Sequence, residues 1–178
     1  MSHITTYQKK RFDPLEATSE DLDIRDIAHA LSLMCRANGH FPKFHSVAQH
    51  CLECVAEAAA RGCSRRVQLG CLLHDASEAY LSDITRPVKA RLQGYREIES
   101  RLQGQIFDKW ISPSLTSEER EQIFAIDDTL LYHEFLHFAG EALWDTPPRL
   151  HSVPDFSFVD FSSAEQSFLC TFASLAEQ

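Results

Sequence analysis

Apolar residues recur at helical spacing along almost the whole chain, and this pattern limits the fold more than any other feature. The 178 residues include only six glycines, and runs that alternate apolar and polar residues, as strands do, are few. A short hairpin is predicted only near residues 4–12. We therefore predict an all-α fold, a compact helical bundle that forms a single domain over residues 1–178.

Capping residues and breaks divide this pattern into helices. Pro87 disfavours helix at the residue before it, so we predict a break over residues 83–89. Residues 144–161, rich in Pro, Asp and Phe, are predicted to be irregular. The candidate N-caps are Asp23, Ser64 and Ser163. The predicted helices cover residues 24–36, 46–61, 64–81, 95–110, 117–143 and 163–178.

Composition and charge limit the compartment and the partners. The chain is 44% hydrophobic and 24% charged, which is typical of soluble globular proteins. Its formal net charge of −9 argues against broad binding to duplex nucleic acid or to an anionic membrane. No run approaches the roughly 18 apolar residues of a membrane span, and the first residues lack the apolar core of a signal peptide. We expect a cytoplasmic protein.

The six cysteines are expected to be reduced. Most of them lie inside apolar helical patterns, as buried thiols of cytosolic proteins do. The pair Cys51-x-x-Cys54 has no second CxxC, so a zinc ribbon is not expected, and redox chemistry stays a minor alternative.

The adjacent pair His74-Asp75 follows an apolar stretch that is typical of a buried helix. Burying two such groups costs several kcal/mol unless they are hydrogen-bonded, paired or bound to a metal. His50 lies on the apolar face of the preceding helix, and Asp127 lies on that of a later helix. Any one such histidine is more often a hydrogen-bonded core residue. Together, however, the four groups form a donor set that suits a first-row divalent metal or zinc.

Glu78 lies four residues after His74, so a continuous helix would place both on one face. A carboxylate one turn beyond a metal ligand can orient or deprotonate a water beside the metal. We therefore predict a metal centre made by three helices, with Glu78 as its acid-base group.

Four motifs, in this order and spacing, resemble those of the HD-domain metal-dependent phosphohydrolases. They are Ser46-Val-Ala-Gln-His50, Leu72-Leu-His74-Asp75-Ala-Ser-Glu78-Ala, Asp83-Ile-x-x-Pro87-Val-Lys89, and Asp127. The branch to which the chain is similar contains bacterial 5′-deoxynucleotidases and phage-type deoxynucleotide hydrolases, and the resemblance spans residues 24–140. It implies an α-helical HD-type domain and metal-assisted hydrolysis of a phosphate ester, usually on a nucleotide.

The resemblance also implies roles for the matched residues. Four of them match the ligands of a divalent metal (Mn, Co, Zn, Fe, Ni or Mg): His50, His74, Asp75 and Asp127. Asp128 is an alternative to Asp127 as the last ligand. Glu78 matches the acidic residue that positions the attacking water, and Asp83 matches a carboxylate on the leaving-group and sugar side.

Contacts to the substrate are expected from three basic residues. The resemblance places Arg36 at a phosphate-binding arginine, although Ala37 stands where similar deoxynucleotidases have an aromatic residue. Lys89 is either a phosphate contact or a solvated loop charge. His45, in the loop before His50, is expected to line the pocket because loops held by helices often carry binding groups.

Two alternative functions and the oligomeric state stay open at this point. A module that binds a nucleotide without hydrolysing it would keep the same pocket. The run His133-Glu134-x-x-His137 has the spacing of a zinc protease motif, but no convincing third ligand follows it. The expected partner is a small-molecule phosphate ester, and a homodimer is expected because relatives of this fold are often dimers.

Overall fold

Helices carry the fold over residues 3–177, the part of the chain that the computed structural model describes. This confirms the predicted all-α class. Within these residues the only sheet is the predicted hairpin, in which β1 (Ile4–Thr5) pairs antiparallel with β2 (Arg11–Phe12). The helices are α1 (Ile24–Leu33), α2 (Val47–Ala60), α3 (Arg65–Leu73), α4 (Glu78–Leu81), α5 (Arg86–Lys89), α6 (Tyr95–Trp110), α7 (Ser117–Ala139) and α8 (Phe161–Ala176).

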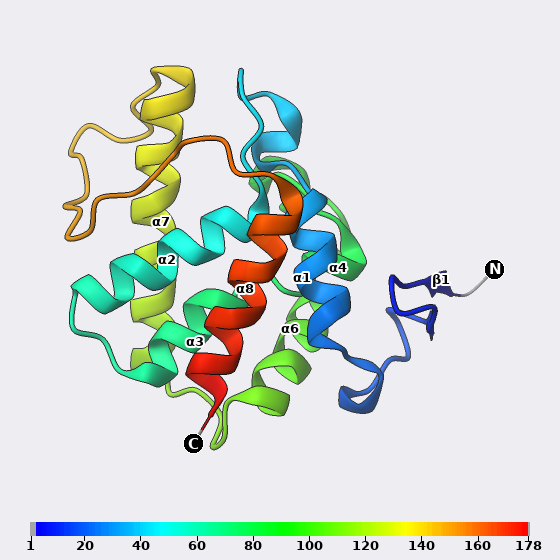
Figure 1. The fold of residues 1–178 in the computed structure, drawn as a ribbon. Helices are drawn as coiled ribbons and strands as arrows, with labels where there is room; N and C mark the ends of the chain where they lie inside the picture. The colour runs from blue at the N-terminus through cyan, green and yellow to red at the C-terminus, as the bar shows by residue number, and fades with distance from the viewer. Residues whose placement is uncertain (1–2, 178) are drawn as a thin grey trace.

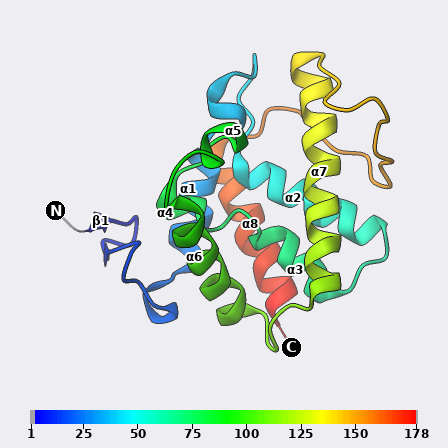
Figure 2. The same ribbon diagram turned by 180° about the vertical axis from the view of Figure 1, so that it is seen from behind.

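Helices α2 and α3 form the centre of the bundle. Helix α2 packs against α1, α3, α7 and α8, and α3 also packs against α6, α7 and α8. Figure 2 shows α7 on one side of this centre and α4, α5 and α6 on the other. The side chains of Val47, Leu72 and Leu130 are fully buried here, and each contributes about 1.5–3 kcal/mol by leaving water. Among residues 3–177, no helix combines the length and the apolar character that crossing a bilayer requires.

The predicted helix over residues 64–81 is two helices, α3 and α4, with turns at residues 74–77 between them. In an unbroken helix the amide of Ser77 would donate to the carbonyl of Leu73. Here the side chain of Gln103, on α6, stands between these groups: its Nε2 donates to the Leu73 carbonyl at 2.7 Å, and its Oε1 accepts from the Ser77 amide at 3.1 Å. A tertiary contact replaces the helical hydrogen bond, and the chain bends at the His-Asp pair.

Helix α1 ends at Leu33, three residues earlier than predicted. The backbone after it pairs with the chain that enters α2, through an isolated bridge between Cys35 and Ser46. The amide of Arg36 donates to the carbonyl of His45 at 2.8 Å. Because residues 35–36 pair with residues 45–46, they do not continue α1, and Arg36 lies next to the start of α2.

Three other boundaries differ from the prediction for local reasons. Helix α7 ends at Ala139, not 143, because Gly140 adopts the left-handed conformation with φ +67°. Helix α8 begins at Phe161, and its N-cap is Asp160, whereas the sequence predicted Ser163 as the cap. The side chain of Asp160 accepts from the amide of Ser163. Pro87 lies within α5, in the first turn, where proline is tolerated. The bounds of α6 agree with the prediction.

Residues 141–160, here called the strap, connect α7 to α8 across α2 (Figure 1). The strap is anchored on Glu57 of α2, whose side chain is fully buried. That carboxylate accepts from the amide of His151 at 3.0 Å, from the amide of Ser152 at 2.8 Å and from Nε of Arg61 at 2.8 Å. Burial raises the pKa of Glu57, but the hydrogen bonds from Ser152, Arg61 and His151 outweigh it and lower the pKa to about 2.

Replacing Glu57 by Gln is expected to lower the free energy of unfolding by about 2–3 kcal/mol, because a charged acceptor of several hydrogen bonds is lost. The folded-state pKa lies below the ordinary 4.5, so the wild-type advantage is present above pH 4.5 and declines as the pH falls toward about 2. Urea unfolding at several pH values measures both effects. The exposed Glu121→Gln variant is the control, and equal stability of the two variants at pH 7 would contradict this account.

Candidate metal centre

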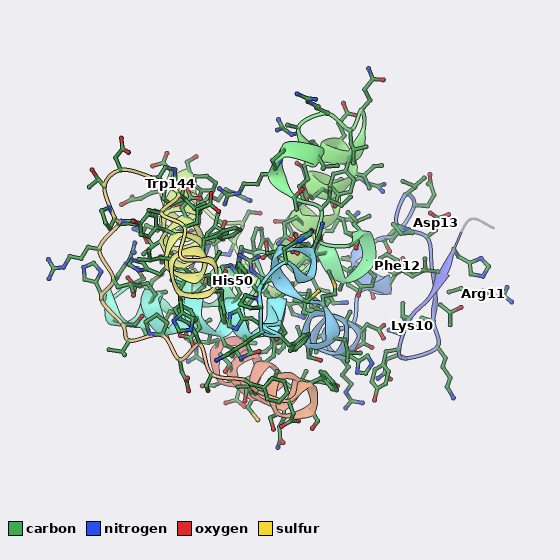
Figure 3. All side chains as sticks on the ribbon, turned by 90° about the horizontal axis from the view of Figure 1, so that it is seen from above. Lys10, Arg11, Phe12, Asp13, His50 and Trp144 are labelled. Carbon is green, nitrogen blue, oxygen red and sulfur yellow. The ribbon has the colours of Figure 1, made fainter. Side chains whose placement is uncertain are left out.

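Four side chains from three parts of the fold meet in the interior, and we call them the ligand cluster: His50, His74, Asp75 and Asp127. The Nε2 atom of His50 lies 3.3 Å from Nε2 of His74 and 3.1 Å from Oδ1 of Asp127. The Nε2 atom of His74 lies 3.3 Å from Oδ2 of Asp75 and 3.7 Å from Oδ1 of Asp127. Figure 3 shows His50 in the middle of the molecule, far from hairpin residues 10–13.

Hydrogen bonds on the far side of each ring define the histidine tautomers. Nδ1 of His50 lies 2.6 Å from Oε1 of Glu134, a carboxylate that also accepts from Nε and Nη2 of Arg36 at 3.2 Å each. Nδ1 of His74 lies 2.7 Å from the carbonyl of Cys71. Carboxylate and carbonyl oxygens only accept, so both Nδ1 atoms donate. In the neutral rings, each Nε2 therefore directs a lone pair into the ligand cluster.

The chemistry of this donor set fits a divalent cation. Two lone pairs and two carboxylates converge, and Arg36 reaches them only by a long contact of 3.5 Å from Nη1 to Oδ2 of Asp75, so a positive charge between the four groups is favourable. Burial lowers the pKa of His74, but Asp75 and Asp127 outweigh it, and the pKa of His74 is well above its ordinary value. Protonating both rings would set two N–H groups against each other, whereas one cation satisfies all four ligands. Tetrahedral ligands at 2.0–2.1 Å lie about 3.4 Å apart, close to the separations observed.

Two buried cysteines flank these ligands. Donor atoms of His50, Cys54 and His74 lie within 4.8 Å of one another, and so do those of Cys51, His74 and Asp75. The described part of the chain thus groups His, Cys and Asp side chains closely enough to hold a metal ion.

The two adjacent aspartates on α7 have different partners. Asp127 directs Oδ1 to the histidines, and its Oδ2 accepts from Nη2 of Arg86 at 3.1 Å. Asp128 accepts from Nη1 of the same arginine at 2.7 Å. Arg86 spans both carboxylates, and only Asp127 reaches the ligand cluster.

Glu78 stays beside the cluster although the helix breaks before it. Its side chain is 4% exposed, Oε1 accepts from Nζ of Lys89 at 3.1 Å, and Oε2 is buried with no hydrogen-bond partner. Lys89 also donates to Glu99 at 2.5 Å. Burial, with added repulsion from Asp75 and Asp83, raises the pKa of Glu78 well above its ordinary value.

Two cavities open onto the ligand cluster, and both are lined by Asp75, Glu78 and Asp127. The smaller has a volume of about 340 Å³ and is mostly polar on the side of α6. The larger has a volume of about 610 Å³, and its polar lining adds Arg36, Asp83 and Arg86, while Lys89 lines both cavities. The larger cavity also has apolar lining residues, here called the apolar wall: Phe41, Leu131, Phe135, Leu143, Trp144 and Phe124, whose ring centroid lies 5.8 Å from the guanidinium carbon of Arg86.

Of the remaining residues predicted to contact the substrate, three line the larger cavity and His45 does not. Arg36, Asp83 and Lys89 line the larger cavity. His45 lines neither of the two cavities: it is 1% exposed, and its Nε2 lies 3.5 Å from Oε1 of Glu134. The expectation that His45 lines the pocket is therefore wrong, because the pairing of its backbone with Arg36 turns the loop inward.

The geometry does not support the protease motif. Nε2 of His133 lies 2.9 Å from the carbonyl of Pro148, and the ring of His137 lies 4.9 Å from that of Phe156. Glu134 points the other way, toward His50 and Arg36. The three side chains of the motif share no site.

Sequence reasoning did not assign three residues that shape the centre. Glu134 lies seven residues after Asp127 on α7, so two helical turns place both on one face. Cys54 lies one turn after His50 on α2 in the same way. These spacings were signals available in the sequence. Gln103 had no such signal, because its role depends on where α6 packs.

The comparisons with known proteins reveal relatives that are themselves uncharacterized. No family model matches the chain. The uncharacterized protein YfdR of Escherichia coli is 36% identical over 117 residues, which cover 66% of this chain and 63% of that protein. An uncharacterized protein of Rhodobacter capsulatus is 36% identical over 127 residues, 68% of this chain and 64% of its own length. The chain thus spans somewhat less than two thirds of these relatives.

Replacing Glu134 by Gln is expected to weaken zinc binding by about 10–100-fold, because His50 loses the carboxylate that orients it. Competition with a chromogenic chelator measures the affinity, and circular dichroism verifies the fold. Glu141→Gln, at an exposed position just beyond α7, is the control. Unchanged affinity in a folded Glu134 variant would show that this carboxylate does not support the centre.

Proposed function

We propose that this protein is a metal-dependent phosphohydrolase that acts on a nucleotide, a deoxynucleoside mono- or triphosphate. The observation that carries the proposal is the convergence of acceptor atoms from His50, His74, Asp75 and Asp127 beside a cavity lined by Glu78, whose Oε2 has no hydrogen-bond partner. The resemblance to the HD-domain phosphohydrolases supports the same reaction class.

When bound, a divalent cation would polarise a phosphoryl oxygen and make a water more acidic. The basic side chains of the protein would bind the phosphate, because a protein of net charge −9 needs local positive charge to hold an anion. Arg36, Arg86 and Lys89 line the polar side of the larger cavity. Arg86 is half exposed at its side chain, so it can contact a phosphate while the buried Arg36 stays paired with Glu134.

Glu78 is placed to take the proton of the attacking water. The ammonium of Lys89 donates to Oε1 of Glu78, and Oε2 has no hydrogen-bond partner, so it is available to accept a proton. Burial, with repulsion from Asp75 and Asp83, raises the pKa of Glu78 well above its ordinary value, and a higher pKa makes its carboxylate a stronger base. The proton from water then resides on Oε2 until it passes to the leaving group or to solvent.

The shape and lining of the larger cavity favour a substrate with an aromatic part. Its volume of about 610 Å³ lies in the range of small-molecule sites. Phosphate charge faces the arginine side, and a base would contact the apolar wall, where Trp144 stacks on Tyr132 at 5.6 Å between ring centroids. A nucleotide supplies both features, whereas a sugar phosphate supplies only the charge.

The reaction is tested by measuring the release of phosphate, pyrophosphate or triphosphate from a nucleotide panel with Mn²⁺ or Co²⁺. Glu78→Gln is expected to lower kcat by at least about 100-fold while metal binding persists, because the proton acceptor is removed. Glu97→Gln, at an exposed position on α6, is the matched control. No turnover of any phosphate ester by metal-loaded wild type would defeat the proposal, and thermal stabilisation by nucleotides alone would then indicate a sensor.

Trp144→Ala is expected to raise KM for nucleotides by roughly fivefold, because about 1 kcal/mol of aromatic contact is lost. KM for a sugar phosphate should change little. Phe158→Ala removes an exposed aromatic of the same strap and serves as the control. Equal effects of the Trp144 variant on both substrates would show that the apolar wall does not bind a base.

A further inference from the structure

A thiol lies directly beside the histidine pair of the ligand cluster. Cys54 follows His50 by one turn of α2, and its side chain is 1% exposed. Its Sγ lies 3.6 Å from Nε2 of His50, and the donor atoms of His50, Cys54 and His74 lie within 4.8 Å of one another. Buried sulfur thus approaches the same ring nitrogen that faces Asp127.

These separations fit three adjacent ligands of one cation, which together with Asp75 and Asp127 would have five protein ligands. Zinc–sulfur and zinc–nitrogen bonds of 2.3 Å and 2.0–2.1 Å place sulfur about 3.6 Å from nitrogen, and two nitrogens about 3.4 Å apart. The structure has 3.6 Å between Cys54 Sγ and His50 Nε2, and 3.3 Å between the two Nε2 atoms. Cys51 is grouped with His74 and Asp75 but not with His50, so Cys54 is the thiol that approaches both histidines.

We propose that Cys54 is a sulfur ligand of the metal centre, so that this chain selects a thiophilic cation such as Zn²⁺ or Co²⁺ over Mg²⁺. The inference builds on the proposed metal centre and not on hydrolysis. Thiolate binds zinc and cobalt strongly and magnesium weakly, whereas a set of imidazole and carboxylate alone discriminates less. When the sulfur–metal bond forms, the thiol proton leaves to solvent.

The test uses the full chain loaded with Co²⁺ or Zn²⁺ and a direct spectroscopic readout. Wild type is expected to show a thiolate-to-cobalt charge-transfer band in the near ultraviolet, and X-ray absorption at zinc should show one sulfur neighbour. Cys54→Ser should lose both signatures, bind zinc at least about tenfold more weakly, and change little in magnesium affinity. Cys51→Ser is the matched control and should keep the sulfur signature. Cys54→Ala is the second variant, and circular dichroism verifies each fold.

Three results would overturn the proposal: a cobalt-loaded wild type without the sulfur band, a band that survives in the folded Cys54 variants, or a band lost in Cys51→Ser instead. If no cation binds at all, both the proposed metal centre and the proposed sulfur ligand are contradicted. If the sulfur signature is present but no phosphate ester is hydrolysed, the sulfur ligand stands and only the proposed activity fails.

Discussion

The buried carboxylate of Glu134 joins three separate parts of the chain. It accepts from Arg36 after α1 and from His50 on α2, while its own backbone belongs to α7. Desolvation of this group is costly, but charge and hydrogen bonds from Arg36, His50 and His45 overcome it, and the pKa of Glu134 stays well below its ordinary value. This network holds the imidazole of His50 in one orientation, so the ligand cluster depends on it.

A second constraint acts on the other side of the cluster. Gln103 replaces the hydrogen bond between Leu73 and Ser77, and the resulting bend gives α3 and α4 different directions. His74 is the C-cap of α3, while Glu78 is the first residue of α4 and lines both cavities. In a continuous helix, the relative position of His74 and Glu78 would be fixed by their spacing of four residues. Because of the bend, the orientations of His74 and Glu78 are set by different helices.

Most of the fold was predictable because it rests on local signals. The caps at Asp23 and Ser64 and the full extent of α6 follow from side-chain hydrogen bonding and helical periodicity. Two of the errors lie where distant groups compete with the helix, whereas the boundaries of α7 and α8 differ for local reasons. The early end of α1 and the division at residues 74–77 both result from hydrogen bonds to segments far along the chain.

For the candidate site, the sequence by itself determined which chemistry was available: two histidines and two aspartates on apolar faces, which need a partner wherever they are buried. Only the tertiary structure decided that their acceptor atoms lie within about 4 Å of one another. It also decided that Asp128 pairs with Arg86 and that His45 lies beside Glu134 and not in the cavity lining. The physical reason is that periodicity specifies the face of one helix. The packing of several helices decides which faces meet, through contacts that no local pattern contains.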